Sequence, residues 1–157
     1  DRTEPSKIIK MARQNNIPVI FFNREPVKED LKQWDKLYYV GCNAEQSGKM
    51  QGQIAAKYIK KNKKVDKNYD GKIQYNKKQW PIIFGIDGLD DALAAIKNGE
   101  MQGTVYNDKE DQALEISRLV VDIYQGNSMK NHNLQQGKYY VSQYKKVEKS
   151  SIDKFIK

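Results

Sequence analysis

Strand-like and helix-like segments alternate along this chain, which predicts an α/β protein with βαβ units around a mostly parallel sheet. Two continuous apolar runs, residues 17–22 and 81–86, have the length and composition of buried parallel strands. Segments with apolar residues at helical spacing separate these runs. The 38% hydrophobic content of the 157 residues is enough for a folded core.

The N-terminal part of the chain is expected to contain two short helical segments and two strands. Pro5 suits an early helical position, where its missing N–H costs nothing, and Asn15-Asn16 ends that helix. The apolar run 17–22 follows as a strand. Residues 27–34 are expected to form a helical turn, and residues 37–40 a second strand.

The clearest helix is predicted to begin after Asn43, a favourable N-cap residue with Gln46 at the capping-box position. Met50, Ile54 and Tyr58 then recur at helical spacing toward a lysine-rich end, where cations complement the helix dipole.

The second half of the chain repeats the alternation. The expected elements are a strand at 81–86, a helix at 89–98, a strand at 104–106, a helix around 113–123, a strand at 140–141 and a short amphipathic helix at 152–156. Gly99 and Gly126 are typical stop signals after the two longer helices.

Three predicted strands end in a polar residue: Asn23, Asp87 and Asn107. Right-handed crossovers place the carboxyl ends of parallel strands at one edge, where ligands bind in open α/β sheets. Carboxylate and amide groups form the paired hydrogen bonds that sugar hydroxyls need. For any one of these residues alone, a turn or N-cap role is the better explanation. The three together fit a ligand-binding edge and a capping role equally well, so both interpretations remain open.

Residues 66–74 match the first nine positions of an EF-hand-type calcium loop. The predicted ligands are Asp66, Asn68, Asp70, the backbone carbonyl of Lys72, and Gln74. Gly71 permits the sharp turn at position 6. Position 12, which normally carries a bidentate glutamate, is Lys77. The alternative is an Asx-rich turn without a metal.

The net charge of +8 and the pI near 9.4 raise the question of nucleic acid binding. The lysines occur mostly singly or in pairs along helix faces, and the chain has few arginines. These are Arg2, Arg13, Arg24 and Arg118. Because phosphate readers favour the guanidinium group, we expect no nucleic acid partner. No apolar run approaches the roughly 18 residues of a membrane span, so the chain is not expected to span a membrane.

We expect a binding protein and not an enzyme. Cys42 is the single cysteine and cannot form an internal disulfide, and His132 lies in a polar stretch that predicts a loop residue. A hydrolase using Asp87 and Asp90 is the enzymatic alternative. It is disfavoured because the sequence has no nucleophile elbow, histidine-based triad or phosphate-binding glycine loop.

Several segments together resemble the glucose/galactose-binding proteins. They are NNIPVIFFNREP at 15–26, YYVGCNAEQSG at 38–48, Gln51-Gly52, the calcium-type loop at 66–74, FGIDGLDDAL at 84–93 and GTVYND at 103–108. Their order and spacing match that family over most of the chain. In the family, a glutamate from a distant segment completes the calcium shell.

The resemblance implies a type I periplasmic-binding fold, with two lobes joined by hinge strands and a sugar held between the lobes. Asn23 would bind the sugar from the N-terminal lobe, Asp87 from the C-terminal lobe, and Asn107 near the hinge. The implied boundaries assign 1–40 to the N-terminal lobe, 41–106 to the C-terminal lobe, 107–140 to the N-terminal lobe, and 141–157 to a final strand and helix.

The chain is shorter than members of that family, so the fold is expected to be partly missing. The first strands of the N-terminal lobe are absent, as is a block of the C-terminal lobe between about residues 75 and 78. Trp34 and Trp80 do not match the family's sugar-stacking positions.

The implied function is that of an extracytoplasmic glucose- or galactose-binding component of an ABC sugar importer, with structural Ca2+. Its partners would be the sugar and the membrane subunits of the importer, or a chemoreceptor or sensor. The implied location is the periplasm, or the cell surface as a lipoprotein. The alternative is a truncated relative that docks on a sensor and binds little or no sugar.

Overall fold

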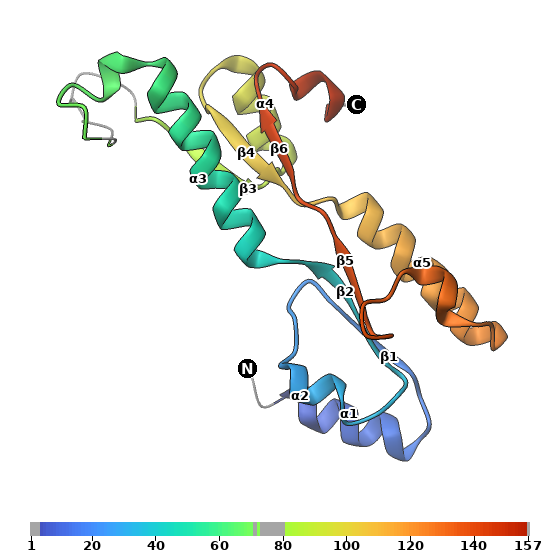
Figure 1. The fold of residues 1–157 in the computed structure, drawn as a ribbon. Helices are drawn as coiled ribbons and strands as arrows, with labels where there is room; N and C mark the ends of the chain where they lie inside the picture. The colour runs from blue at the N-terminus through green and yellow to red at the C-terminus, as the bar shows by residue number, and fades with distance from the viewer. Residues whose placement is uncertain (1–3, 71, 73–80, 157) are drawn as a thin grey trace. The chain divides into compact units, whose positions relative to one another are not determined.

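The computed structural model describes residues 4–70, 72 and 81–156, and divides the chain into two compact units (Figure 1). Unit 1 comprises Asp1–Asn43 and Asp108–Gln143, and unit 2 comprises Ala44–Asn107 and Tyr144–Lys157. The chain therefore passes from one unit to the other three times, after Asn43, Asn107 and Gln143.

Unit 1 is built on a three-stranded parallel sheet with the order β1-β2-β5. Its elements in chain order are α1 (Glu4–Gln14), β1 (Val19–Phe22), α2 (Lys28–Leu31), β2 (Leu37–Cys42), α5 (Lys109–Gln125), the 3-10 helix η2 (Met129–His132) and β5 (Tyr139–Ser142). Helix α5 contacts both β2 and β5, whereas α1 contacts α2. The core here is formed by Ile9, Leu31, Leu37 and Tyr39.

Unit 2 has a second three-stranded sheet with the order β3-β4-β6. Its elements are α3 (Ala44–Lys61), the 3-10 helix η1 (Lys63–Val65), β3 (Phe84–Asp87), α4 (Asp90–Asn98), β4 (Gly103–Tyr106), β6 (Lys145–Glu148) and the 3-10 helix η3 (Ile152–Lys154). Helix α3 contacts all three strands, and α4 contacts β4 and η3. Leu93, Ile96, Val147 and Ile152 form the core.

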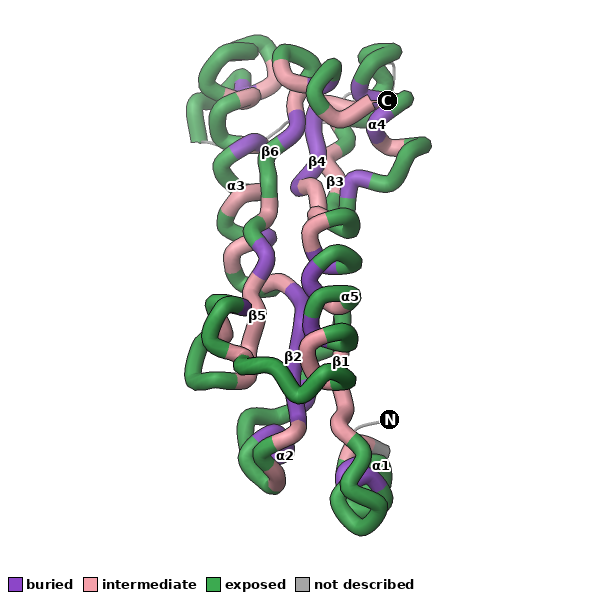
Figure 2. Tube along the Cα trace, turned by 90° about the vertical axis from the view of Figure 1, so that its right-hand side faces the viewer, coloured by how far each residue is buried: buried purple, intermediate pink, exposed green. Residues whose placement is uncertain are grey.

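Burial follows the position of each strand in its sheet. The central strands β2 and β4 are almost entirely buried, as the purple segments of Figure 2 show. The predicted buried runs at 17–22 and 81–86 are more exposed than expected, because β1 and β3 each pair with a single neighbouring strand in the described part of the chain. Phe22 is 66% exposed and Ile83 is 44% exposed.

Two elements near the C-terminus differ from the sequence prediction. Strand β6 was not predicted, and it pairs antiparallel with β4. Its sequence KKVE buries only Val147 completely, so it carries almost no hydrophobic signal. The predicted helix at 152–156 is wrong: the structure has the short 3-10 helix η3 there, because so few residues do not offset the cost of helix nucleation.

The core of unit 2 yields a stability prediction. Ile96 is fully buried, so Ile96→Ala should lower the free energy of unfolding of this unit by about 2–5 kcal/mol. Hydrogen exchange of the amides of α4 and β4 would measure the change. The control Ile83→Ala removes a half-exposed side chain and should cost clearly less. Equal losses for the two variants would contradict the packing of α4 described above.

Candidate functional site

Unit 2 brings two of the predicted ligand residues together at the carboxyl ends of neighbouring strands. Asp87 is the last residue of β3 and Asn107 directly follows β4. The strands are parallel, with Asp87 opposite Tyr106. The backbone N–H of Asn107 donates to the carbonyl of Asp87 over 3.1 Å. Asp87 and Asn107 are therefore neighbours in the backbone at this edge of the sheet.

The backbone at Asp87 is in an unusual conformation. Asp87 has φ 76° and Gly88 has φ 65°, so two consecutive residues are left-handed. An added Cβ on Gly88 would lie 2.7 Å from the Tyr106 ring, which explains why only glycine fits there. Left-handed conformations cost of order 1–3 kcal/mol outside glycine and concentrate at ligand sites.

Unit 1 holds the third residue, Asn23, in a similar way. Asn23 follows β1 with φ 64°, and its side chain is exposed. Its backbone N–H donates to the carbonyl of Val40 over 3.2 Å, and its carbonyl accepts from the Tyr39 hydroxyl over 3.1 Å. Both backbone groups of Asn23 are thus tied to β2.

A glycine makes the contact between Tyr39 and Asn23 possible. A Cβ added to Gly41 would lie 2.0 Å from the Tyr39 hydroxyl oxygen, so any other residue would displace the tyrosine ring. Tyr39 also packs edge-on against Tyr139, with ring centroids 6.1 Å apart. Tyr39 and Gly41 are positioning residues for Asn23 that the sequence pattern did not single out.

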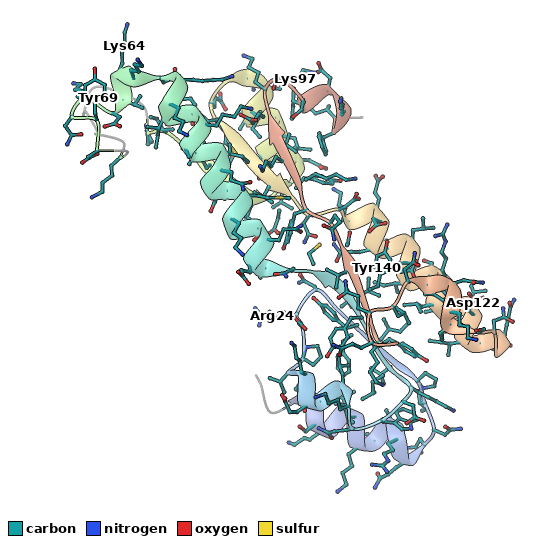
Figure 3. All side chains as sticks on the ribbon, viewed as in Figure 1. Arg24, Lys64, Tyr69, Lys97, Asp122 and Tyr140 are labelled. Carbon is teal, nitrogen blue, oxygen red and sulfur yellow. The ribbon has the colours of Figure 1, made fainter. Side chains whose placement is uncertain are left out.

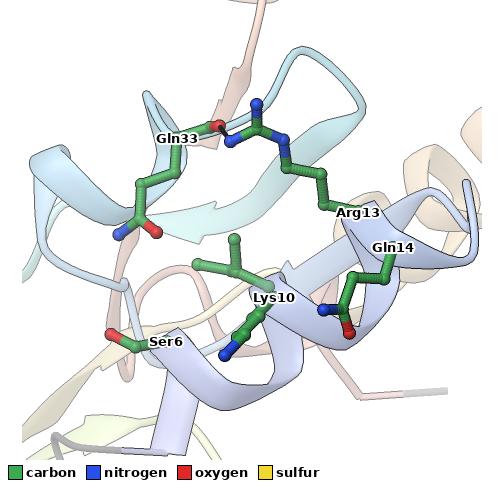
Figure 4. Close-up of a pocket in the computed structure, with 6 residues that line it drawn as sticks. Ser6, Lys10, Arg13, Gln14 and Gln33 are labelled. Carbon is green, nitrogen blue, oxygen red and sulfur yellow. Dashed lines mark hydrogen bonds between the residues drawn. The ribbon is translucent and has the colours of Figure 1, made fainter.

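Unit 1 also contains a pocket between α1 and the residues after α2, with a volume of about 460 Å³ (Figure 4). It is lined by Ser6, Ile9, Lys10, Arg13, Gln14 and Gln33. The Arg13 guanidinium donates to the Gln33 carbonyl over 3.5 Å across its rim. No predicted sugar-binding residue lines this pocket, so it is separate from the strand-end positions.

The calcium-type loop folds as a tight turn held by its own acidic residues. Asp66 is buried, and its Oδ1 accepts from the backbone N–H of Asp70 over 3.0 Å. Asp70 in turn accepts from the backbone N–H of Lys72 over 2.9 Å and from the Asn68 amide over 3.0 Å. The predicted ligand Gln74 lies outside the described residues, as do Gly71 and Lys77.

The side chains of this loop are of the chemical type that binds a hard cation. Two carboxylates and one carboxamide occupy alternate positions of the loop, and their oxygen atoms are of the type that binds calcium. Calcium takes six to eight oxygen ligands, so the described side chains supply part of a shell. Across the described ranges, no cluster of three or more His, Cys, Asp or Glu side chains forms a metal site of its own.

His132 does not lie in an open loop as the sequence predicted. It belongs to η2, is only 4% exposed, and bonds to two carboxylates of α5. Its Nδ1 lies 2.7 Å from Glu115 Oε1 and its Nε2 lies 2.8 Å from Asp122 Oδ2. Both ring nitrogens of His132 therefore lie within hydrogen-bonding distance of a carboxylate. These contacts join η2 to α5.

The carboxylate of Asp122 is stabilised by this arrangement. A hydrogen bond from Asn127 and a second from His132 lower the pKa of Asp122 below its ordinary value. The contribution of Asp122 to stability is therefore present above its unfolded pKa and is lost as the pH falls through the lowered value.

A second polar cluster joins the N-terminus of α5 to β5. The Asp111 carboxylate accepts from the Tyr140 hydroxyl over 2.9 Å and from the Ser142 hydroxyl over 2.5 Å. Burial, followed by the hydrogen bond to Asp111, raises the pKa of Tyr140 to about 12. Near it, the Gln112 amide donates to Cys42 Sγ over 3.5 Å. Asp108 caps the same helix by accepting from the Asp111 N–H.

Comparisons with known proteins agree with this architecture. Residues 1–74 match the periplasmic binding protein domain family. The D-galactose/methyl-galactoside binding periplasmic protein MglB of Haemophilus influenzae is 26% identical over 232 residues, covering 96% of this chain and 70% of that protein.

Two solved structures have similar folds. An ABC transporter solute binding protein from Bacillus halodurans with bound myo-inositol aligns with a TM-score of 0.68 at 19% identity, covering 99% of this chain and 74% of the other. A chain of a XylFII–LytSN complex mutant aligns with a TM-score of 0.52 at 14% identity, covering 98% and 75%. The predicted fold class is thereby confirmed: the chain has the type I periplasmic-binding fold.

Within that class, the chain resembles the glucose/galactose-binding proteins, as its motifs predicted. The aligned stretch of 232 residues exceeds the 157 residues of this chain, so at least 75 positions of that alignment have no counterpart here. The relatives are binding proteins by name, in line with the expectation of a non-enzyme. Among the helices the structure describes, none combines the length and apolar character needed to cross a bilayer.

The cluster of Tyr140 and Asp111 gives a pH prediction. A tyrosine pKa raised by folding contributes stability that is complete below pH 10 and is lost as the pH rises through about 12. Asp111→Asn removes the negative charge and should lower the pKa of Tyr140 toward 10, as followed by the NMR shift of its ring carbon. The control Asp122→Asn should leave it unchanged. An unchanged pKa in Asp111→Asn would show that Asp111 does not raise the pKa of Tyr140.

Proposed function

We propose that this chain is the sugar-binding component of an ABC importer and acts outside the cytoplasm. Its ligand class is a monosaccharide, glucose or galactose, and Asn23, Asp87 and Asn107 supply hydrogen bonds to the hydroxyls. The similarity to a galactose-binding periplasmic protein supports the ligand class, and the similarity to an ABC transporter solute binding protein supports the importer.

The observation that carries the proposal is the pair of Asp87 and Asn107. Their strands are parallel neighbours, and the hydrogen bond between their backbones places both residues at the carboxyl end of the sheet. A carboxylate accepts two sugar hydroxyls, and a carboxamide donates to one and accepts from another. The left-handed backbone at Asp87 and Asn23 is compatible with a binding role, because left-handed residues occur at ligand sites as well as at turns.

Neither tryptophan is proposed as a stacking platform for the sugar. Trp34 packs against the core of unit 1, with Lys36 Nζ 6.0 Å from the centre of its ring. Trp80 lies outside the described residues. The sugar contacts proposed here are therefore hydrogen bonds, and the affinity rests on a small number of them.

We also propose that Ca2+ binds the loop at 66–74 as a structural ion. Asp66, Asn68 and Asp70 would contribute side-chain oxygens, Lys72 its backbone carbonyl, and Gln74 its amide oxygen. The ion would fix the loop that follows α3. The exposed lysines nearby repel a divalent cation, but exposed charges are screened and each costs little.

The partners proposed for the sugar-loaded form are the membrane subunits of the importer. A receptor or sensor protein is the alternative partner. Anchoring as a lipoprotein is a further part of the proposal that membrane fractionation of expressing cells would test.

Calorimetry of the full chain tests the sugar proposal. Galactose or glucose should bind with a Kd of about 1 mM or tighter. Asp87→Asn keeps the shape and tolerates the left-handed backbone but removes the charge, so it should weaken binding by about tenfold or more. The matched control is Asp153→Asn, because Asp153 is an exposed aspartate of η3.

The ligand panel separates the alternatives. If the chain binds myo-inositol and neither hexose, the proposed ligand class changes from a monosaccharide to a cyclic polyol. Myo-inositol is bound in one of the structurally similar proteins. If none of the three ligands gives a binding signal at millimolar concentration, the importer proposal is wrong. An interaction protein that binds little or no sugar is then the better interpretation.

Thermal unfolding tests the calcium proposal. Asp70→Asn keeps an oxygen to accept from the Lys72 N–H but removes one carboxylate. The Tm of the wild-type chain should rise with calcium, and this rise should shrink in Asp70→Asn while the two melt alike in chelator. Asp153→Asn should keep the full calcium response. If the wild-type Tm is the same with calcium and with chelator, the loop is a turn without a metal.

A further inference from the structure

The positive charge of the chain is concentrated in one short segment of unit 2, here called the basic segment, from Lys60 to Lys72. It contains the six lysines Lys60, Lys61, Lys63, Lys64, Lys67 and Lys72. Against two aspartates, the segment has a net charge of +4, half of the +8 of the whole chain. All six lysines are exposed.

The fold gathers these lysines at one end of unit 2. The last turn of α3 carries two of them, η1 carries the next two, and α3 and η1 are in contact. Lys64 and Tyr69 lie at this same end of the unit (Figure 3). The clustering of the lysines is therefore spatial as well as sequential.

An exposed aromatic residue lies within the basic segment. Tyr69 is 78% exposed, and its φ of 61° is an outlier for a bulky side chain. The turn that holds it is closed by the bond from the Asp70 N–H to Asp66. The left-handed backbone at Tyr69 therefore carries a strain cost while its ring lies in water.

We propose that the basic segment docks on an anionic phospholipid surface, with Tyr69 entering the headgroup region. Lysines near such a surface are attracted to acidic headgroups over about one Debye length, and tyrosine rings favour the membrane–water interface. The turn at Tyr69 already holds the ring exposed before the chain meets the membrane. Docking therefore does not need to order this loop, which avoids an entropic cost of binding. This docking depends on neither sugar nor calcium binding.

Vesicle co-sedimentation of the full chain in chelator tests the docking. The chain should bind vesicles of phosphatidylcholine mixed with phosphatidylglycerol, and not vesicles of phosphatidylcholine alone. Binding should fall as salt shortens the Debye length from about 10 Å at 0.1 M to about 3 Å at 1 M. Chelator removes calcium bridges, so the outcome is independent of the calcium site.

Charge-matched variants locate the binding surface. The triple variant Lys63→Gln, Lys64→Gln, Lys67→Gln should lower the partition coefficient by about 100-fold. The control triple Lys7→Gln, Lys28→Gln, Lys32→Gln removes the same charge from exposed positions of unit 1 and should bind nearly as the wild type. Equal losses in the two triples would mean a response to net charge alone, which overturns the proposal.

Tyr69→Asn separates docking from a structural role. Asparagine accepts a left-handed backbone more readily than tyrosine, so the variant should melt at the same or a higher temperature. Its vesicle binding should nevertheless fall severalfold, because the ring is gone. Unchanged vesicle binding would overturn the role of Tyr69. Binding to soluble polyphosphate without binding to acidic vesicles would identify a polyanion site and overturn the membrane proposal.

Discussion

Parallel pairing of β1 with β2 and of β3 with β4 is the constraint on which the candidate site depends. It brings the carboxyl ends of neighbouring strands to one edge in each unit. The residue after one strand can then bond to the backbone of the next, as Asn23 does with Val40 and Asn107 does with Asp87. Polar residues that follow neighbouring strands of one sheet therefore lie at the same edge of that sheet.

Two of the left-handed backbone positions lie at these same edges. Asn23 and Asp87 are both left-handed, and each is supported by a tyrosine that a glycine accommodates. Tyr39 reaches the Asn23 carbonyl because Gly41 leaves it room, and Gly88 lies against the Tyr106 ring. The strain is offset by hydrogen bonds and packing within each sheet, which hold the backbones of Asn23 and Asp87 in place.

The polar groups buried elsewhere in unit 1 serve the fold. His132 uses both ring nitrogens on carboxylates of α5, and Tyr140 and Ser142 both donate to Asp111. These bonds attach η2 and β5 to one helix. A tyrosine whose pKa is raised to about 12 is poorly suited to proton transfer near neutral pH. This arrangement is consistent with a binding protein.

Local pattern alone determined most of the helices and strands, the polar residues that end the strands, and the family that the chain resembles. Periodicity, capping residues and motifs are properties of neighbouring residues. Only the tertiary structure decided what depends on distant pairing. It made the apolar runs of β1 and β3 half exposed at sheet edges, added β6 with a single fully buried valine, and buried His132 between Glu115 and Asp122. It also set Asn23 and Asp87 in left-handed conformations. Those features arise from contacts between residues far apart in the chain, which no local pattern encodes.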